Sequence, residues 1–200
     1  FQNIGGADFP FQRTGLFLQK GCYAPNSLVN AQDTFMWVGG GENEGPAIWA
    51  LSGNSTVKVS TTAIDSLLSK LTQSQVASVY SWAYASKGGY FIGFSLPSTT
   101  LVYDTTSQRW HERKSVIEGF LGTYRVASVV KAYNTILCGD MIDGRIGELN
   151  PNVYTEYGIA IIRRVATQPF QNNMQSVFFP SLELTVESGV GNEDVVDPQI

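Results

Sequence analysis

Short apolar runs bounded by glycine, asparagine, serine or proline recur along almost the whole of this 200-residue chain. Such runs are typical of strands, and their glycine-rich or polar boundaries are typical of turns. Many short strands at regular spacing predict an all-β fold of antiparallel strands, as a sandwich, barrel or propeller. The predicted strands are Gly15–Lys20, Ser27–Asn30, Thr34–Val38, Ala47–Leu51, Thr56–Ser60, Val76–Ala85, Tyr90–Ser95, Thr100–Tyr103, Arg109–Arg113, Val126–Ala132, Thr135–Cys138, Arg145–Leu149, Ile159–Ala166 and Gln175–Val186.

One segment, Ser60–Leu71, has a different period. Its apolar residues stand at i, i+3, i+4 and i+7, the spacing of one helical face: Ile64, Leu67, Leu68 and Leu71. Hydroxyl side chains at its start can cap a helix N-terminus. We therefore predict one amphipathic helix at about residues 61–71, inserted between strands and covering an open end of the β core.

The strands also repeat as units of two apolar runs with a glycine-containing turn between them. The three units are FMWVGG…AIWALSGNS, YFIGFS…TLVYDTTSQ and ILCGDMIDGRIGELNPN. Their aligned turn residues Ser52, Asp104 and Asn150 are separated by 52 and 46 residues. Propeller blades have about 40–50 residues and four strands each. We predict a single β-propeller-like domain over residues 1–200, about four blades' worth, with a sandwich of meandering hairpins as the alternative.

The composition excludes several classes of function. The formal net charge is −4, and no run of basic residues provides the phosphate neutralisation on which DNA wrapping depends. No apolar stretch approaches the roughly 20 residues that span a bilayer. Cys22 and Cys138 form no C-x-x-C pair, which excludes a zinc ribbon or a thioredoxin-like motif. His111 is the only histidine, which excludes multi-histidine zinc sites and two-histidine iron sites. We expect two buried free thiols and no metal or cofactor site.

The segment Trp110-His111-Glu112-Arg113 is the only cluster with the composition of an acid–base pair. Successive strand residues point to opposite faces, so His111 and Glu112 do not face each other. Trp110 and Glu112 are expected on one face, and His111 and Arg113 on the other. No serine, threonine or cysteine stands out as a nucleophile, and we predict a structural strand with no catalytic residues.

Three carboxylates, Asp140, Asp143 and Glu148, surround Gly144. Their spacing does not match the alternation of a calcium-binding loop. Asp-Gly is a favoured two-residue hairpin turn, so Asp143 and Gly144 are predicted at a hairpin corner. The glycines Gly39, Gly40 and Gly41 lack the lysine and helix of a phosphate-binding loop and predict a turn. The tryptophans are expected to be buried between sheets: Trp37, Trp49, Trp82 and Trp110.

Several segments resemble one family along nearly the whole chain. They are GCYAPNS (21–27), MWVGG, KVSTTAID (58–65), GGYFIGFSLPSTTLVYDTTSQRWHER (88–113), GDMIDGRIGELN (139–150), IIRRVATQPF and LELTVESGVG (182–191). The most specific piece is VYDTTSQRWHER. These segments are similar to the packaged-DNA stabilisation proteins of short-tailed bacteriophages, also called tail accessory factors or head-completion proteins.

The resemblance implies a β-propeller-like subunit of the virion tail, present in the host cytoplasm during assembly. Such proteins form a homo-oligomeric ring beneath the portal and its adaptor, close the exit channel over packaged DNA, and connect to the tail needle and tailspikes. The family brings no catalytic, cofactor-binding or metal-binding residues. Its members are more than twice as long, so the chain is expected to be an internal piece of a longer propeller.

The resulting hypothesis is a non-enzymatic head-to-tail connector with no membrane and no sequence-specific nucleic-acid partner. One alternative is a carbohydrate-binding or glycan-hydrolysing tail propeller, which needs paired carboxylates about 5–9 Å apart. The acids close enough in sequence to form such a pair are Glu112, Asp140, Asp143 and Glu148. A second alternative is a protein-interaction propeller of cellular origin.

Overall fold

The computed structural model describes residues 2–3, 5–6, 8–12, 17–166, 177–181 and 183. The chain separates into two compact units, Phe1–Ile161 and Ile162–Ile200, and the regular elements of the described residues belong to the first. The single domain expected over residues 1–200 stays a prediction, since most of the second unit lies outside the described residues.

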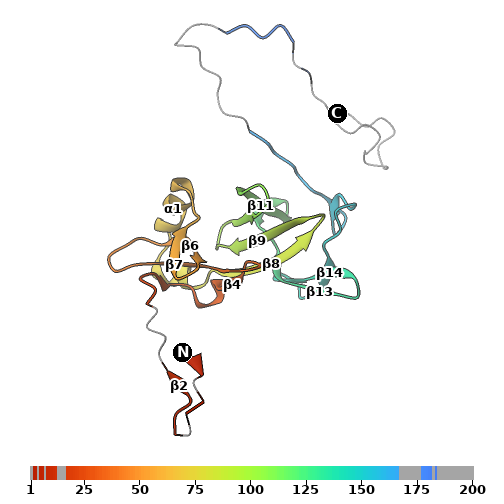
Figure 1. Cartoon of the computed structure of the whole chain (residues 1–200). Coiled ribbons are helices and arrows are strands. Elements are labelled where there is room, and N and C mark those ends of the chain that lie inside the picture. The colour runs from red at the N-terminus through yellow and green to blue at the C-terminus, as the bar shows by residue number, and fades with distance from the viewer. Residues whose placement is uncertain are drawn as a thin grey trace. The chain divides into compact units, whose positions relative to one another are not determined.

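Three antiparallel sheets follow one another along the first unit (Figure 1). Sheet 1 contains β3 (Gly21–Cys22), β4 (Val29–Asn30), β5 (Phe35–Gly40), β6 (Ala47–Ser52) and β7 (Ser55–Lys58). Sheet 2 contains β8 (Tyr80–Ser86), β9 (Gly89–Ser95), β10 (Thr100–Asp104), β11 (Arg109–Ile117) and β12 (Phe120–Thr123). Sheet 3 contains β13 (Val126–Ala132), β14 (Thr135–Asp140) and β15 (Ile146–Glu148).

The remaining elements are short. Two hairpins, β1 (Gln2–Asn3) with β2 (Phe11–Gln12) and β16 (Thr155–Glu156) with β17 (Ile159–Ala160), pair separately from the three sheets. The helices are the 3₁₀ turn η1 (Pro25–Ser27), α1 (Thr62–Ser69) and α2 (Gln73–Ala77).

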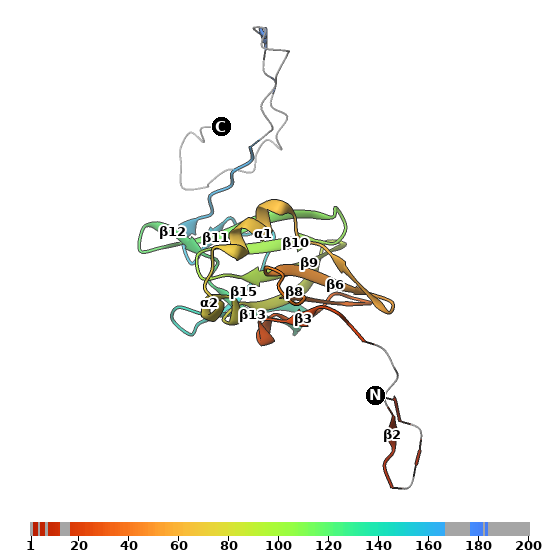
Figure 2. The same cartoon turned by 90° about the vertical axis from the view of Figure 1, so that its left-hand side faces the viewer.

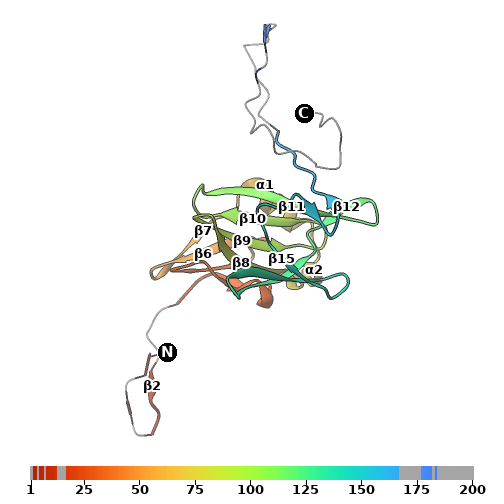
Figure 3. The same ribbon diagram turned by 90° about the vertical axis from the view of Figure 1, so that its right-hand side faces the viewer.

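Each sheet is a meander in which consecutive strands pair. In sheet 1, β3 and β4 both pair with β5, on either side of η1, so that one interrupted strand precedes β5. The predicted repeat is confirmed, because Ser52 and Asp104 end the third strand of sheets 1 and 2, and Asn150 follows the third strand of sheet 3. The first strands adjoin one another, since β8 contacts both β4 and β13. Figures 2 and 3 show β8 and β13 toward one edge of the unit and β11 toward the opposite edge.

Two-residue turns close several of the hairpins. Lys87 and Gly88 join β8 to β9, and Tyr133 and Asn134 join β13 to β14, all with positive φ. Positive φ at both central positions is the mark of the type I′ turn, whose twist matches that of paired strands. These turns set the register of the strands that they join. The register in turn decides which apolar side chains point toward the neighbouring sheet.

Core 1 lies between sheets 1 and 2. Sheet 1 contributes Met36, Val38 and Ile48, and sheet 2 contributes Ile92 and Phe94, all buried. The helices close this core with the buried residues Ile64, Leu68 and Val76.

Core 2 lies between sheets 2 and 3 and consists of Trp82, Val102, Val126 and Cys138, with partly buried aromatic residues around them. Val102 is adjacent to Leu101 of core 1, so β10 contributes alternate side chains to both cores. Trp82 is paired with Gly93, where a Cβ would collide with the indole ring, so this close approach requires glycine.

The predicted helix is confirmed as α1, and Thr61 caps its N-terminus by accepting from the Ile64 backbone amide. The strand predicted over Val76–Ala85 was wrong in its first part, because α2 occupies Gln73–Ala77 and the strand begins at Tyr80. A capping box explains the difference. Thr72 and Gln75 satisfy each other's backbone amides, which starts a helix that buries Val76.

Other sequence expectations need correction. Within Gly15–Lys20, the described residues 17–20 form no strand, and of Ile159–Ala166 only Ile159 and Ala160 are paired. Most of Gln175–Val186 lies outside the described residues, while β12 was not predicted. Cys138 is buried as expected, but Cys22 is exposed. Trp37 and Trp82 are buried, and Trp49 and Trp110 are partly buried.

Replacing Trp110 with alanine should lower the free energy of unfolding by about 3 kcal/mol. Its ring packs 4.9 Å from that of Tyr103 and 6.1 Å from that of Phe94, measured between centroids. Its indole nitrogen donates to the Val59 carbonyl at 3.1 Å. Trp110→Phe is the matched control, because it keeps most of the packing and should lose only about 1 kcal/mol with the hydrogen bond. Urea unfolding measures both, and a loss below about 1 kcal/mol for Trp110→Ala would place this ring outside the core.

Candidate functional site

The Trp110–Arg113 segment lies on β11, paired with β10. Trp110 packs into core 1, whereas His111 contacts the ring of Phe91 on the core 2 side. Arg113 lies on the same side as His111 and donates to its Nε2 at 3.3 Å. The predicted division of the segment between two faces is therefore confirmed. Desolvation and the positive charge of Arg113 lower the pKa of His111, which favours a neutral, hydrogen-bond-accepting imidazole.

Arg113 is surrounded by aromatic rings between sheets 2 and 3. Its guanidinium carbon lies 5.4–5.9 Å from four ring centroids, those of Trp82, Tyr84, Phe91 and Tyr124. Its Nη1 also donates to the Tyr84 hydroxyl at 2.6 Å. Cation–π contacts of this kind are stronger when they are desolvated. Burial raises the pKa of Tyr124, so this phenol stays protonated beside the guanidinium.

Two of the four nominated carboxylates do converge, and they converge on Arg125. The Arg125 Nε donates to Asp140, and its Nη2 donates to Asp143 at 3.0 Å. Arg145 pairs with Asp143 as well, and the ring of Tyr157 lies 4.6 Å from the Arg125 guanidinium and 3.8 Å from that of Arg145. We call these five residues the Arg125 cluster.

The Arg125 cluster keeps its carboxylates ionised. Burial acts to raise the pKa of Asp140, but hydrogen bonds from Arg125 and from the loop backbone lower it overall. The hydrogen bond from Arg145 lowers the pKa of Asp143. A glycosidase acid needs the opposite shift, a raised pKa that keeps a proton at neutral pH. The convergence of these acids therefore gives no support to glycan hydrolysis.

The other two nominated acids lie apart from this cluster. Glu112 accepts from the Thr99 hydroxyl at 3.2 Å and pairs with Lys114 at 3.4 Å. Glu148 accepts from the side chain of Asn150 at 3.5 Å.

The predicted two-residue Asp143-Gly144 turn was wrong in its length. Residues 141–145 form a longer loop between β14 and β15, closed by the Asp140 backbone amide donating to the Arg145 carbonyl at 2.9 Å. The Asp140 carboxylate accepts from the Ile142 amide at 2.7 Å and shapes the loop from inside. Gly144 does occupy a corner, with φ of 71°. The loop is thus built around the ion pairs of Asp140 and Asp143.

Sequence reasoning missed one acid, Glu156 on β16. It accepts from the Ser115 hydroxyl at 3.0 Å, and the same hydroxyl accepts from the Arg125 backbone amide at 3.1 Å. Burial raises the pKa of Glu156. The residues that meet here are separated by up to 41 positions, so no local motif could have indicated the site.

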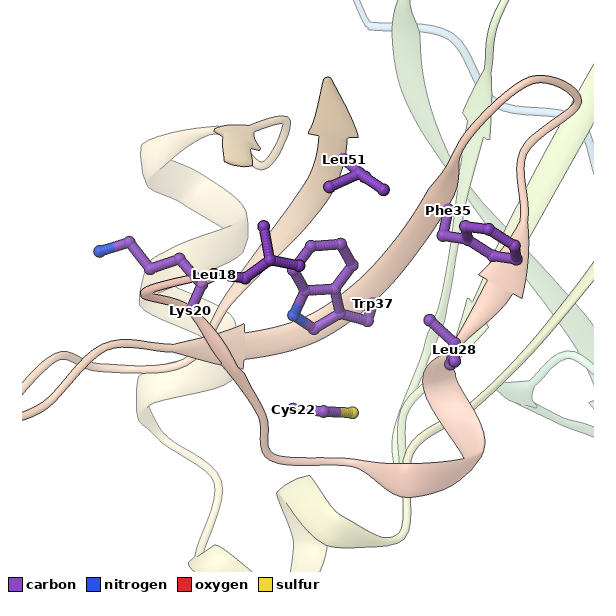
Figure 4. Close-up of a pocket in the computed structure, with 7 residues that line it drawn as sticks. All are labelled: Leu18, Lys20, Cys22, Leu28, Phe35, Trp37 and Leu51. Carbon is purple, nitrogen blue, oxygen red and sulfur yellow. The ribbon is translucent and has the colours of Figure 1, made fainter. Parts of the chain in front are cut away.

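A shallow apolar pocket opens on the face of sheet 1 that points away from sheet 2 (Figure 4). It holds about 300 Å³ and is lined mainly by Leu18, Cys22, Leu28, Phe35, Trp37 and Leu51. Lys20 contributes its stem, while its ammonium points away from the other lining residues in Figure 4. That ammonium donates to both carboxylate oxygens of Glu44 and lies 4.6 Å from the ring of Trp49. No carboxylate lines the pocket among the described residues.

In residues 17–166 and the other described positions, no three histidine, cysteine or acidic residues are grouped as metal ligands. No helix there is long and apolar enough to cross a bilayer. Cys22 and Cys138 are free thiols.

Three successive antiparallel meanders with adjoining first strands are the arrangement of propeller blades. Residues 1–154 match the model of a family, Phage_stabilise, described as bacteriophage P22 Gp10, beta-propeller. The chain belongs to this family. Its members are phage DNA-stabilisation and head-completion proteins. Among curated proteins, no relative matches the chain.

Membership in the P22 Gp10 family confirms the predicted resemblance and the β-propeller fold. The matched range includes the Trp110–Arg113 strand, the sheet 1 pocket, and Arg125, Asp140, Asp143 and Arg145. Glu156 and Tyr157 follow directly after it. The features described above therefore belong to a protein of a phage structural stabilisation family.

Replacing Asp140 with asparagine should destabilise this P22 Gp10-family chain by about 3–5 kcal/mol at pH 7, because it removes the buried carboxylate partner of Arg125 and leaves only the more exposed Asp143 paired with it. Only 1% of the Asp140 side chain is exposed, against 38% for Asp143. Asp143→Asn is therefore the matched control and should cost much less, because solvent screens the ion pairs of this exposed carboxylate. Urea unfolding measures both variants. If they lose equal free energy of unfolding, the Arg125–Asp140 pair does not contribute more than the pairs of Asp143, and the prediction is wrong.

The same pair predicts a loss of stability in acid. The folded-state pKa of Asp140 is lowered, so its contribution is present above the unfolded pKa of about 3.9 and is lost as the pH falls through the folded value. The stability difference between wild type and Asp140→Asn should shrink below about pH 4. Urea unfolding between pH 7 and pH 2.5 checks this, and a constant difference would argue against it.

Glu156 should show the opposite dependence. Its folded-state pKa is raised, so its favourable contribution is present below the unfolded pKa of about 4.3 and is lost as the pH rises through the folded value. Glutamine at this position keeps an acceptor for Ser115 and carries no charge. Glu156→Gln should therefore gain stability relative to wild type as the pH rises from 4 to 8. A stability difference that does not change over this range would show that burial of the carboxylate is not costly.

Proposed function

We propose that the chain is a non-enzymatic structural part of the phage virion, a head-to-tail connector in the tail. In this role it closes the portal channel after packaging, stabilises the packaged DNA, and bridges the portal adaptor to the tail needle and tailspikes. It acts within a homo-oligomeric ring and is present in the host cytoplasm during assembly. The observation that carries the proposal is the match to the P22 Gp10 family over residues 1–154.

The charge distribution supports closure of the channel by protein contacts. The net charge is −4, and several of the cations are occupied within the fold. Arg113 is enclosed by aromatic rings, Arg125 and Arg145 belong to the Arg125 cluster, and Lys20 is paired with Glu44. Affinity for DNA without sequence preference needs cations that are free to neutralise phosphates. A ring that retains DNA by blocking its exit does not need them.

The polar chemistry of the sheets supports a non-enzymatic role. The converging acids, Asp140 and Asp143, are neutralised by Arg125 and Arg145, and the sheet 1 pocket is lined almost entirely by apolar side chains. Exposed aromatic side chains instead stand on hairpins, with 79% of Phe120 and 93% of Tyr133 accessible to solvent. Aromatic residues are enriched at protein interfaces, which suits a component that works through contacts with its neighbours.

A binding experiment tests the proposal. The purified 200-residue chain is mixed with the portal-adaptor protein of a short-tailed phage of matching type, and the masses of the species are measured by native mass spectrometry. We expect a complex of the two proteins, and the same assay is repeated with tail-needle and tailspike proteins. If the chain associates with none of these components, the connector proposal fails.

A second measurement separates closure by protein contacts from direct DNA binding. The same chain is titrated with a 30-base-pair duplex at about 0.15 M salt, where non-specific binding through phosphates is already weakened. We expect no measurable binding. Binding that weakens steeply as salt increases would instead show that the chain holds DNA through phosphate contacts.

A further inference from the structure

The β16–β17 hairpin is attached to the three sheets by side chains. Within the described residues its two strands pair with each other alone, and the Ile161 amide closes the hairpin by donating to the Tyr154 carbonyl at 3.0 Å. Neither core includes a residue of this hairpin among the described positions. A two-stranded hairpin is marginally stable by itself, so its docked position depends on the side chains that reach the sheets. We call residues 154–161 the wedge.

Two side chains of the wedge reach groups of sheets 2 and 3. On the side of sheet 2, the buried Ser115 hydroxyl of β11 donates to Glu156 at 3.0 Å. On the side of sheet 3, the ring of Tyr157 lies against the guanidinium groups of Arg125 and Arg145. These contacts bridge the two sheets with one hydrogen bond and two cation–π contacts.

The wedge also lies beside the thiol of Cys138. A Cβ at Gly147 would stand 2.7 Å from the Tyr157 hydroxyl and 3.2 Å from the Cys138 sulfur, so both groups lie over this glycine of β15. Cys138 is buried, whereas Cys22 is exposed. The reactivity of Cys138 therefore reports whether the wedge is in place, and Cys22 serves as an internal reference.

The chain just before the wedge is held independently of it. Leu149 packs against core 2, and its amide donates to the Ile136 carbonyl at 2.8 Å. A turn follows, in which the carbonyl and the side chain of Asn150 accept from the amides of Val153 and Asn152. Sheet 3 therefore keeps its contacts up to Leu149 whether or not the wedge is docked.

We propose that the wedge is detachable, that it leaves and re-enters its place between sheets 2 and 3 while both sheets stay folded, and that the charge of Glu156 sets the balance. Local opening is typical of segments with few buried apolar contacts, and Tyr154, Tyr157 and Ile159 are all partly exposed. Detachment moves the point at which the chain leaves the sheets from Ile161 back to Leu149. At about 3.3 Å per extended residue, this gives the following chain roughly 40 Å of additional reach.

The surroundings of Glu156 determine the direction of the pH dependence. Burial raises its pKa, the charge of Arg125 acts in the opposite sense, and the charge of Asp140 acts with burial. Tyr124 and Cys138 also face it, and both stay neutral because burial raises their pKa. The docked wedge thus favours protonated Glu156. Raising the pH ionises this carboxyl and shifts the balance toward the detached state.

The rate at which each cysteine reacts with a dipyridyl disulfide reagent tests the proposal. The reagent is added to the full 200-residue chain, and labelling of Cys22 and Cys138 is followed by peptide mass spectrometry. Cys138 should react more slowly than Cys22 but faster than global unfolding of the same sample allows. Its rate should depend only weakly on urea, because detachment exposes little surface.

Substitutions of Tyr157 test which contacts hold the wedge. Tyr157→Ala should raise the labelling rate of Cys138 about tenfold or more, because it removes the cation–π contacts. Tyr157→Phe keeps the ring and should stay within about twofold of the wild-type rate. Tyr133→Ala is the matched control, since it removes an exposed tyrosine from the β13–β14 hairpin of sheet 3 and should leave the rate unchanged.

A double variant tests the close approach at Gly147. Gly147→Ala should also speed labelling of Cys138, because its methyl group would collide with the Tyr157 hydroxyl. Adding Tyr157→Phe removes this hydroxyl and leaves the nearest ring carbon at 3.5 Å, an ordinary contact distance. The double variant should therefore recover most of the protection that Gly147→Ala loses.

Glu156→Gln tests the role of charge. Glutamine keeps an acceptor for Ser115 and carries no charge, so at about pH 8 Cys138 of this variant should react more slowly than that of the wild type. Near pH 4 the two rates should agree. Taking the ratio of variant to wild type at each pH cancels the pH dependence of the thiol itself.

Three outcomes would overturn the proposal. Cys138 that reacts only as fast as the chain unfolds globally would show that the wedge does not detach. A rate that Tyr157→Ala leaves unchanged would show that another segment covers the thiol. A Glu156→Gln ratio that is equal at both pH values would contradict the role of this charge. Circular dichroism confirms that each variant is folded, and none of these results depends on binding to tail components or on the proposed connector role.

Discussion

The structure depends on the burial of both faces of sheet 2. Along β10, Leu101 enters core 1 and Val102 enters core 2, and β9 alternates in the same way with Ile92 and Phe91. This alternation means that one sheet contributes side chains to both cores. Sheets 1 and 3 need not contact each other, because each is stabilised by its own side of sheet 2.

The two cores differ in how they accommodate polar groups. Core 1 is closed by aliphatic residues of α1 and α2, and its polar contacts include the hydrogen bond from the indole nitrogen of Trp110 and those that the buried Ser27 and Ser60 hydroxyls accept from backbone amides. Around core 2, Arg113 and Arg125 are held by aromatic rings and carboxylates. Across the described residues, every buried side-chain nitrogen and oxygen has a hydrogen-bond partner. The contacts of Arg113 and Arg125 therefore hold sheet 3 and the loop of residues 141–145 in place. Such rigidity suits a component of an assembly.

Local patterns predicted most of the fold, and long-range polar contacts could not be predicted from them. The strand runs, the α1 periodicity and the repeat of Ser52, Asp104 and Asn150 each depend on neighbours in sequence, and each was confirmed. Alternation also placed His111 and Arg113 on one face correctly. The strand predicted from Val76 is wrong because the capping box of Thr72 and Gln75 starts a helix there. The Arg125 cluster brings together residues between positions 125 and 157, and no local pattern indicates that they meet. The Asp-Gly sequence at 143–144 by itself predicts only a short turn.

Native-state hydrogen exchange, measured by mass spectrometry on the full 200-residue chain, tests the role of sheet 2 most directly. If both cores rest on this sheet, the amides of β9 and β10 should exchange most slowly, at the rate set by global unfolding. Amides of sheets 1 and 3 should exchange at the same rate or faster, and never more slowly. Fast exchange in β9 and β10, with β5 and β6 or β13 and β14 still protected, would contradict the account.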